Sequence, residues 1–298
     1  MKKFMFLFIA TIFLTTVAYA TDSQIWDSMR LTNILEYGKE NSLHLGPLFV
    51  KLQSQYFYKI FFGILIGVPF VFFLHYLIVG PKVFSHDGVK IYAFSVFKRI
   101  IHLLAVIAFV IIVPTGLMIA FGKYFGGGTI IEYARHLHGL ATILFSIAVI
   151  PMFLFWFKDM LPTFDDIKWM FILGGYLSKE KKKIPAGKFN AGQKMWFWVA
   201  TLGGIVMIIT GAFMYLQDFD YGIAKFFGIS QIDLLRATAI THNVLAFVVM
   251  ALFFTHIYMS LFAIKGAVQS MITGYKEEEE VKYLHSTWYK KLKKEKKI

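Results

Sequence analysis

The chain has 298 residues, of which 57% are hydrophobic and only 16% charged, and it contains no cysteine. An ordinary soluble domain is less apolar, so we expect an integral membrane protein. Without cysteine, the chain offers no disulfide, no Cys-ligated zinc or iron–sulfur site and no Cys-x-x-Cys-His attachment of c-type haem. The net charge of +13 resides mainly in lysines between apolar segments and in the tail. This pattern is typical of membrane topology and does not indicate nucleic-acid binding.

The first twenty residues have the layout of a cleavable secretory signal. Lys2 and Lys3 precede an apolar core, which ends in the sequence AYA at positions 18–20. We expect cleavage after Ala20, with an uncleaved signal anchor as the alternative. The polar residues 21–56 then form an exported periplasmic segment.

Five apolar segments follow, each long enough to cross the hydrocarbon core of a bilayer, which is about 30 Å thick. They cover residues 57–79, 100–121, 137–157, 195–216 and 239–264. The predicted fold is therefore an all-α membrane protein. It has a four-helix transmembrane bundle over residues 98–265 and one additional N-terminal transmembrane helix over residues 57–79.

The loops predict the orientation. Lysines concentrate in residues 80–99, in residues 158–194 and in the tail 266–298, and the positive-inside rule places these three in the cytoplasm. A cleaved signal puts the mature N-terminus in the periplasm, and five spans then bring the C-terminus to the cytoplasm. The two arguments agree on a multi-pass protein of the bacterial inner membrane, with a solvated cytoplasmic tail.

Four histidines lie at two depths of the predicted bundle. His242 and His256 are 14 residues apart on the last span, which corresponds to about 21 Å along a helix and an offset of about 40° around it. His138 lies near the outer end of its span, level with His242, and His102 lies near the inner end of its span, level with His256. Two bis-histidine pairs in a protein without cysteine are what two b-type haems need.

The same histidines could instead form hydrogen bonds between helices or line a transport path.

The haem interpretation is favoured by small residues on the spans, which allow close approach of a porphyrin to the backbone. These residues are Gly116, Gly139, Gly203, Gly204 and Gly211.

Five further histidines are weaker candidates. His136 points to a different helix face from His138 and is the alternative ligand, or a partner of a haem propionate. For His75 we expect a structural or interfacial role, although it could compete with His102 or serve a quinone. His44, His86 and His285 occur in polar segments and are expected to be solvated.

The sequence KFNAGQKMWFW at 188–198, the two histidines of the last span and the following YMSLFAIKGAVQSMITG resemble the cytochrome b (gamma) subunit of respiratory formate dehydrogenases. The resemblance covers about residues 98–289. It implies that His102 and His256 are the axial ligands of an inner haem, and His138 and His242 those of an outer haem. The paired histidines alone are shared with the cytochrome b subunits of membrane nickel–iron hydrogenases.

The resemblance also implies a quinone pocket beside the inner haem, formed by Asn190, Gly192, Gln193 and His256, with menaquinone as the expected quinone. Amide side chains donate and accept hydrogen bonds, which suits a quinone carbonyl. A helix entry with Asn190 as its N-cap accounts for the NAGQK sequence equally well.

By this resemblance the chain is an electron-transfer anchor without a catalytic site of its own. It implies that electrons arrive from a periplasmic iron–sulfur subunit, pass two haems and reach quinone on the cytoplasmic side. A separate molybdenum or tungsten subunit of formate dehydrogenase carries the catalysis, in an assembly that can be a higher oligomer. We expect contact with membrane lipid and none with nucleic acid.

Three other functions compete with this interpretation. The chain could serve a nickel–iron hydrogenase or another periplasmic oxidoreductase with the same haem ligands. A transporter with a histidine relay is disfavoured, because the spans show no inverted repeat and lack intramembrane carboxylates. A structural anchor leaves the matched histidines unexplained.

Overall fold

A computed structural model describes residues 43–217 and 222–298. The predicted signal sequence, and the exported segment as far as residue 42, lie outside these ranges. Within them, five helices are long and apolar enough to cross a membrane. They cover Leu45–Ile78, Val96–Ala120, Gly128–Met160, Ala191–Tyr215 and Gln231–Ala263. The predicted all-α fold with five spans is confirmed.

The first long helix is continuous but not uniformly α-helical. It consists of α3 (Leu45–Lys51), α4 (Tyr58–Phe62) and α5 (Val68–Ile78), joined by π-helical turns at Leu52–Phe57 and Gly63–Gly67. Such turns hold one extra residue per turn and are accommodated where neighbouring helices pack against them.

This helix begins at Leu45, twelve residues before the start that hydropathy predicts. Residues 45–56, assigned from the sequence to the exported segment, continue the span. Their Leu, Lys and Gln are good helix formers, and Pro47 falls in the first turn, where its missing N–H has no helical partner to lose. Polarity alone therefore hid the start of the helix.

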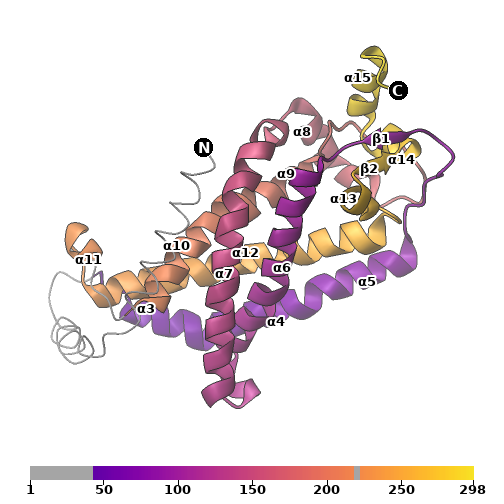
Figure 1. Cartoon of the computed structure of the whole chain (residues 1–298). Coiled ribbons are helices and arrows are strands. Elements are labelled where there is room, and N and C mark those ends of the chain that lie inside the picture. Colours follow the sequence, from indigo (N-terminus) through magenta and orange to yellow (C-terminus); the bar gives the residue numbers. More distant parts are fainter. Residues whose placement is uncertain (1–42, 218–221) are drawn as a thin grey trace.

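The remaining long helices form two packed pairs (Figure 1). α6 (Val96–Ala120) and α7 (Gly128–Trp156) are joined by a short turn and pack along each other. α9 (Ala191–Trp198) continues through a π-helical turn into α10 (Gly204–Tyr215), which packs along α12 (Gln231–Tyr258). In Figure 1, α6 and α7 run steeply up the picture while α5 and α12 run across it.

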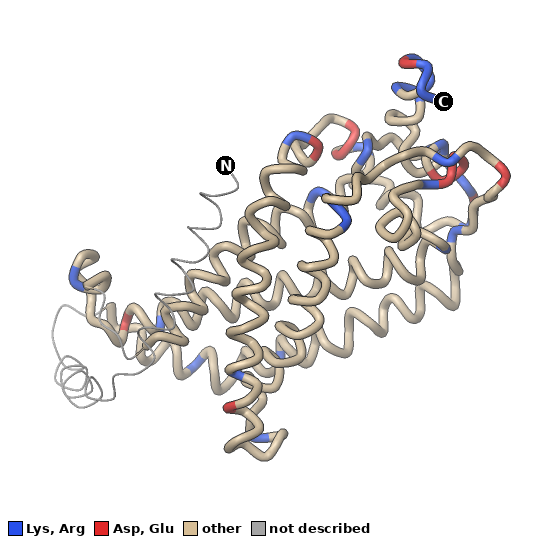
Figure 2. Tube along the Cα trace, viewed as in Figure 1, with Lys and Arg blue, Asp and Glu red and all other residues tan. Residues whose placement is uncertain are grey.

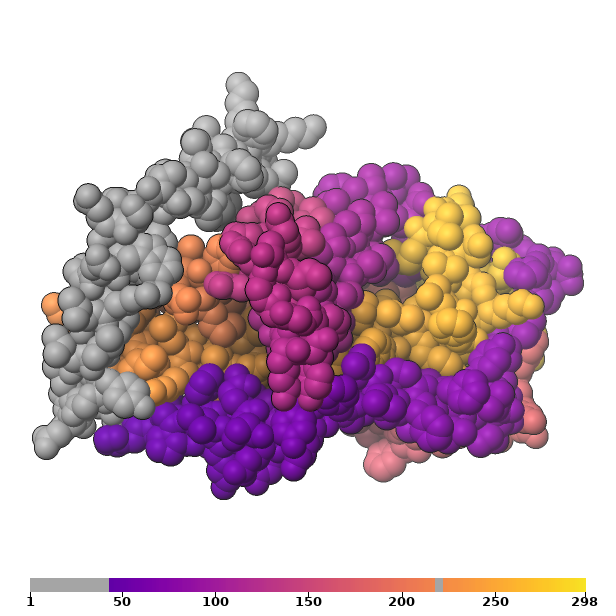
Figure 3. Space-filling view, turned by 90° about the horizontal axis from the view of Figure 1, so that it is seen from below, coloured from indigo at the N-terminus to yellow at the C-terminus, as the bar shows by residue number. Residues whose placement is uncertain are grey.

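The first helix packs along α12 and forms one flank of the molecule, seen in indigo and purple in Figure 3. Its contact with α12 is aromatic. The rings of Phe57 and Phe61 lie edge-on to Phe247, at centroid distances of 5.4 and 4.6 Å. Phe61 also packs against Phe121 at the end of α6. Edge-to-face pairs of this kind add to the energy of area burial.

Polar contacts fasten the first helix at both ends. The backbone N–H of Leu43 donates to Oδ2 of the fully buried Asp233, at 2.7 Å. At the other end, Nδ1 of His75 lies 2.6 Å from the Tyr258 hydroxyl, and Nε2 lies 2.8 Å from the Tyr176 carbonyl. His75 thus ties the first helix to α12 and to the loop after α8, consistent with the structural role expected for it.

At one end the bundle carries a folded polar region, which we call the cap, comprising residues 79–95, 157–190 and 264–298. Its two-stranded antiparallel sheet pairs β1 (Lys90–Tyr92) with β2 (Tyr275–Glu277). Its helices are α8 (Phe164–Phe171), α13 (Gln269–Thr273), α14 (Glu278–Leu284) and α15 (Ser286–Lys294). The opposite end of the bundle, with α11 (Ile223–Phe226), is called the far side below. In Figure 2 most charged residues lie in the cap, while the helices between the two ends are almost free of charge.

The expectation of a solvated tail is wrong for much of residues 266–298. Val281 and Leu284 are buried, and Leu292 packs with Ile91 of β1. The charges of Lys276 and Glu280 form a buried ion pair within the tail. Because Lys and Glu dominate this part of the sequence, its buried apolar residues Val281, Leu284 and Leu292 were not recognised before the pairing of β1 with β2 was known.

Candidate metal centres and the adjacent polar network

The four histidines at matched depths meet in two pairs. On the cap side the rings of His102 and His256 lie 6.2 Å apart between centroids. On the far side the rings of His138 and His242 lie 6.5 Å apart. The structure therefore brings together the residues of both predicted pairs, each drawn from α12 and one helix of the α6–α7 hairpin.

These separations suit one metal ion held between two imidazoles. Two metal–nitrogen bonds of about 2 Å each, plus the distance from each ring nitrogen to its centroid, separate the centroids by about 6 Å. Direct stacking or a hydrogen bond between the rings would bring them closer. Among the described residues no group of three or more metal-binding side chains occurs, so a metal at either pair needs its remaining ligands from elsewhere, as from a porphyrin.

On the far side, α6 holds the ring of His138 by its Nδ1 atom. Nδ1 lies 3.1 Å from the Ile112 carbonyl and 3.1 Å from the Thr115 hydroxyl. A carbonyl can only accept, so Nδ1 carries the proton and Nε2 is the nitrogen left to bind a metal.

His242 has the same arrangement on α10. Its Nδ1 lies 2.9 Å from the Thr210 hydroxyl. Hydrogen bonds of this kind fix the tautomer and the orientation of a metal-binding histidine.

The glycines of the spans pack against side chains. A Cβ at Gly116 would lie 3.2 Å from Cε1 of His138, and one at Gly211 would lie 3.4 Å from Cε1 of His242. Gly139 faces Tyr215, and Gly204 faces Phe145. Gly116 and Gly211 therefore seat the imidazoles themselves, a role that was not predicted from the sequence.

On the cap side the surroundings of the pair are aromatic. Trp196 of α9 stacks on His256, with centroids 5.5 Å apart and an interplanar angle of 19°. Within the described residues, the side chains of His102 and His256 have no hydrogen-bonding partner. This pair is held by ring packing, in contrast to the far-side pair.

A layer of aromatic side chains fills the bundle between the two levels. Phe109 contacts Phe145, Phe253 and Trp196, at centroid distances of 5.0, 5.4 and 5.6 Å. Alanines and valines of α6, α7 and α12 complete this core. Tight apolar packing of this kind excludes water from the space between the pairs.

His136, the alternative to His138, lies away from the far-side pair. Its Nδ1 is 3.1 Å from the hydroxyl of Tyr215, and the two rings lie edge-on. A separation of two residues turns the side chain to another face of α7.

The predicted quinone residues lie at the start of α9, on the cap side. Asn190 is the N-cap of the helix, and its Oδ1 accepts from the Gln193 N–H at 2.9 Å. Gln193 Oε1 in turn accepts from the Asn190 N–H at 3.0 Å, which completes a capping box. Both side-chain carbonyl oxygens are thus engaged, while neither side-chain NH2 group has a partner within the described residues.

The space beside Gly192 is already filled. A Cβ there would lie 3.0 Å from Cη2 of Trp169. Trp169 belongs to α8 and packs edge-on to Tyr176 of the cap. Gly192 therefore admits a tryptophan ring to the helix start, a packing reason that the sequence alone did not suggest.

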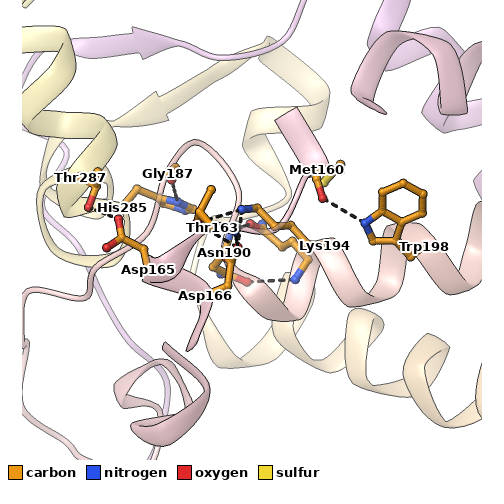
Figure 4. A network of polar contacts seen from close by, with 11 residues as sticks. Met160, Thr163, Asp165, Asp166, Gly187, Asn190, Lys194, Trp198, His285 and Thr287 are labelled. Carbon is orange, nitrogen blue, oxygen red and sulfur yellow. Dashed lines mark hydrogen bonds and ion pairs between the residues drawn. The ribbon is translucent and has the colours of Figure 1, made fainter. Parts of the chain in front are cut away.

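Next to this helix start lies a buried ion pair, seen in Figure 4. Nζ of Lys194 lies 2.7 Å from Oδ2 of Asp166. The same oxygen accepts from the N–H and the hydroxyl of Thr163, at 2.6 and 2.9 Å. Both charged side chains are buried, so each depends on the other for compensation.

The C-terminal tail forms hydrogen bonds with the segment that leads into α9. The N–H groups of Ser286 and Trp288 donate to the carbonyls of Ile184 and Ala186. Nδ1 of His285 donates to the Gly187 carbonyl at 2.9 Å, as Figure 4 shows. The prediction that His285 is solvated is wrong, since its side chain is almost completely buried. Burial, reinforced by the charge of Lys276, lowers the pKa of His285 to about 4.

His86 lies at the surface of the cap, where its Nδ1 is 3.0 Å from Glu277. For this residue the expected exposure holds, since the side chain is 72% exposed. Sequence reasoning could not separate His86 from His285, because both occur in segments rich in polar and charged residues.

A family model for prokaryotic cytochrome b561 matches residues 93–274, which is more than half of the chain. The chain belongs to the prokaryotic cytochrome b561 family. The match contains all four paired histidines and the NAGQK helix start, and the long helix α3–α5 precedes it. Membership implies b-type haem, in agreement with the geometry of the pairs.

Curated relatives of this cytochrome b561 protein carry formate dehydrogenase names. The chain is 29% identical to the formate dehydrogenase cytochrome b556 subunit of Haemophilus influenzae over 196 residues, covering 64% of this chain and 79% of the relative. It is 27% identical to the nitrate-inducible cytochrome b556(Fdn) subunit of Escherichia coli, covering 55% and 72%. For the cytochrome b556(fdo) subunit of the same species the identity is 25%, covering 66% and 90%.

Proposed function

We propose that this cytochrome b561 protein is the membrane-anchoring cytochrome b subunit of a formate dehydrogenase. Its relatives are named as such subunits, and they match over most of their own length. The chain would pass electrons from a periplasmic iron–sulfur subunit through two b-type haems to quinone on the cytoplasmic side. A b-type haem, when bound, takes up and releases single electrons. Formate oxidation itself belongs to the separate molybdenum or tungsten subunit.

The observation that carries this proposal is the meeting of four histidines in two pairs with centroid distances of 6.2 and 6.5 Å. His102 and His256 would hold the cap-side haem, and His138 and His242 the far-side haem. The protonated Nδ1 atoms of the far-side pair support this assignment, because they direct Nε2 of each ring to the metal.

We place the quinone pocket at the start of α9, where Asn190 and Gln193 present their NH2 groups as donors. Trp196, about one turn after Gln193 on α9, stacks on His256, so quinone at this helix start would lie beside the cap-side haem ligand. Menaquinone is the proposed quinone. Gly192 would contribute indirectly, because its missing Cβ leaves room for the Trp169 ring beside the pocket.

The proposed orientation has the cap in the cytoplasm and the far side in the periplasm of a bacterial inner membrane. Its support is the distribution of charge, since most lysines of the described residues lie in the cap (Figure 2). Protons for quinone reduction would then come from the cytoplasmic side, while electrons cross from the far side to the cap.

The test is a haem measurement on the purified protein. A reduced-minus-oxidised spectrum should show b-type bands, and the haem content should be two per chain. A spectrum without b-type bands contradicts the whole proposal, and a content of one haem contradicts the assignment of two pairs. Co-purification then identifies the partner. A formate-oxidising subunit supports the proposal, whereas a hydrogenase subunit would show that the partner enzyme oxidises hydrogen and not formate.

A further inference from the structure

Two short sequences on different helices surround the far-side histidines in the same way. Thr115 and Gly116 of α6 contact His138, and Thr210 and Gly211 of α10 contact His242. In each case a threonine is followed by a glycine, and both residues face one imidazole on the neighbouring helix. The sequences PTGLM and ITGAF share only the Thr-Gly pair, so the repetition is evident in three dimensions and not in composition.

The hydrogen-bond pattern of the two threonines is also the same. The Thr115 hydroxyl donates to the Ile111 carbonyl at 2.6 Å, four residues earlier. The Thr210 hydroxyl donates to the Val206 carbonyl at 2.8 Å, again four residues earlier. A hydroxyl has one proton, so in both cases its oxygen is free to accept from the Nδ1–H of the histidine.

On α6 the carbonyl three residues before the threonine adds a second acceptor. Ile112 O lies 3.1 Å from Nδ1 of His138. The hydroxyl is thus the acceptor that the two Nδ1–H groups share. The absent Cβ of the following glycine leaves the room that the ring needs, at 3.2 and 3.4 Å.

The cap-side pair lacks this feature. Within the described residues, His102 and His256 have ring contacts but no acceptor for Nδ1. A metal-binding histidine that donates its second N–H to an acceptor becomes a more basic ligand. A more basic ligand favours the oxidised iron, which has the higher positive charge, and so lowers the reduction potential.

We propose that Thr115-Gly116 and Thr210-Gly211 are positioning residues that set the far-side haem to a lower reduction potential than the cap-side haem. This inference rests on the proposed function, since it takes the two histidine pairs as haem ligands. Two haems ordered in this way favour electron transfer from the far side to the cap. The direction is then built into the hydrogen bonds of the ligands.

The experiment measures the reduction potentials of both haems in the purified protein by following their spectra against an applied potential. The variants are Thr115→Val, Thr210→Val and the double variant, each of which removes an acceptor from Nδ1 but keeps the shape of the side chain. The far-side potential should rise in each single variant and rise further in the double variant. The cap-side potential should stay constant.

Two controls make the result specific. Thr115→Ser and Thr210→Ser keep the hydroxyl and should restore the wild-type potential. Thr201→Val is a matched substitution on the same helix pair: Thr201 is fully buried and donates to the carbonyl four residues earlier, but within the described residues it makes no hydrogen bond to a histidine. It should change neither potential.

The possible outcomes separate the two levels of the proposal. Retention of both haems with an unchanged far-side potential in the double valine variant overturns the inference and leaves the haem assignment intact. Loss of the far-side haem alone supports positioning by these residues, whereas loss of both haems, with Thr201→Val intact, overturns it. If the wild type shows no b-type spectrum, the proposed function fails before the variants are compared.

Discussion

The two histidine levels differ in how the protein holds the rings. On the far side, two Thr-Gly pairs hold His138 and His242 in a nearly symmetric setting of hydrogen bonds. On the cap side, His102 and His256 sit in an aromatic setting, and Trp196 covers only one of them. On the far side, similar hydrogen bonds on both rings fix the orientation of the imidazoles. On the cap side, aromatic packing and the folded cap hold the helices that carry the rings.

The difference indicates a division of roles. The far-side level has its polar contacts inside the apolar bundle, from Ile112, Thr115 and Thr210, and none of these residues belongs to the cap. The cap-side level is linked through α9 to Asn190, to the buried ion pair and to the tail. In the proposed function, the cap side is therefore the level at which proton uptake by quinone would be coupled to the bundle.

The largest expected effect comes from removing one ligand at each level. His242→Ala should abolish the far-side haem and keep the cap-side haem, and His256→Ala should do the reverse. Haem content should fall from two to one per chain in either variant. Two haems retained in both variants would remove the basis of the comparison.

A steric block should affect the far side alone. The Cβ of Gly116→Val and of Gly211→Val would lie 3.2 and 3.4 Å from the rings of His138 and His242, and the two methyl groups add further bulk there. Each variant should therefore displace its ring and lower far-side haem content by at least half. Gly63→Val is the matched control, because no neighbouring helix or side chain in the described part of the chain lies within 4 Å of a Cβ at that position. Equal loss at both levels would show that the block is not local.

A change at the start of α9 should affect quinone reduction on the cap side and neither haem. Asn190→Ser keeps an N-cap oxygen but loses the NH2 donor, so we expect quinone reduction to slow about tenfold, the cost of roughly one hydrogen bond. Both haem spectra should remain unchanged. Normal quinone turnover in this variant would contradict the placement of the pocket.

The buried ion pair offers a test of how firmly the cap holds the cap-side level. Asp166→Asn or Lys194→Met leaves an unpaired buried charge, which costs about 3–5 kcal/mol of stability, whereas the double variant should cost less than either single one. The measurement is thermal denaturation of the haem-loaded protein, together with haem content at each level. Additive losses would show that the two side chains act independently.

The smallest effect concerns pH and the tail. The pKa of His285 is about 4 in the folded protein and about 6.5 when exposed, so the unfolded tail binds a proton that the folded tail excludes. The stabilisation is complete above about pH 6.5 and is lost progressively as the pH falls to about 4, by about 3 kcal/mol. Amide hydrogen exchange of residues 275–292 should accelerate at pH 5 relative to other cap segments, after correction for intrinsic rates. His285→Gln should remove this pH dependence.

The sequence was sufficient for the five spans and for the pairing of depths, because membrane length and helical period are local properties. Helical phase predicted that His136 and His138 face different sides of their helix, but it did not choose between them. The structure places His136 beside Tyr215.

What could not be predicted depends on contacts between distant segments. The burial of His285 requires strand pairing of β1 with β2 and the backbone bonds of the tail to residues 184–187. The Thr-Gly pairs become meaningful only once α6 lies beside α7 and α10 beside α12. The early start of the first helix was missed because polar residues at a membrane boundary form helices as readily as loops.

The first helix has a further consequence for the response to the membrane itself. It is fastened to α12 at Leu43–Asp233 on the far side and at His75–Tyr258 on the cap side, with aromatic contacts between. α12 supplies one histidine to each level. The distance between the levels is therefore set by one helix, which the first helix supports along its length. When bilayer thickness changes, helices respond chiefly by tilting. Such tilting would move both levels together and leave the distance between them unchanged.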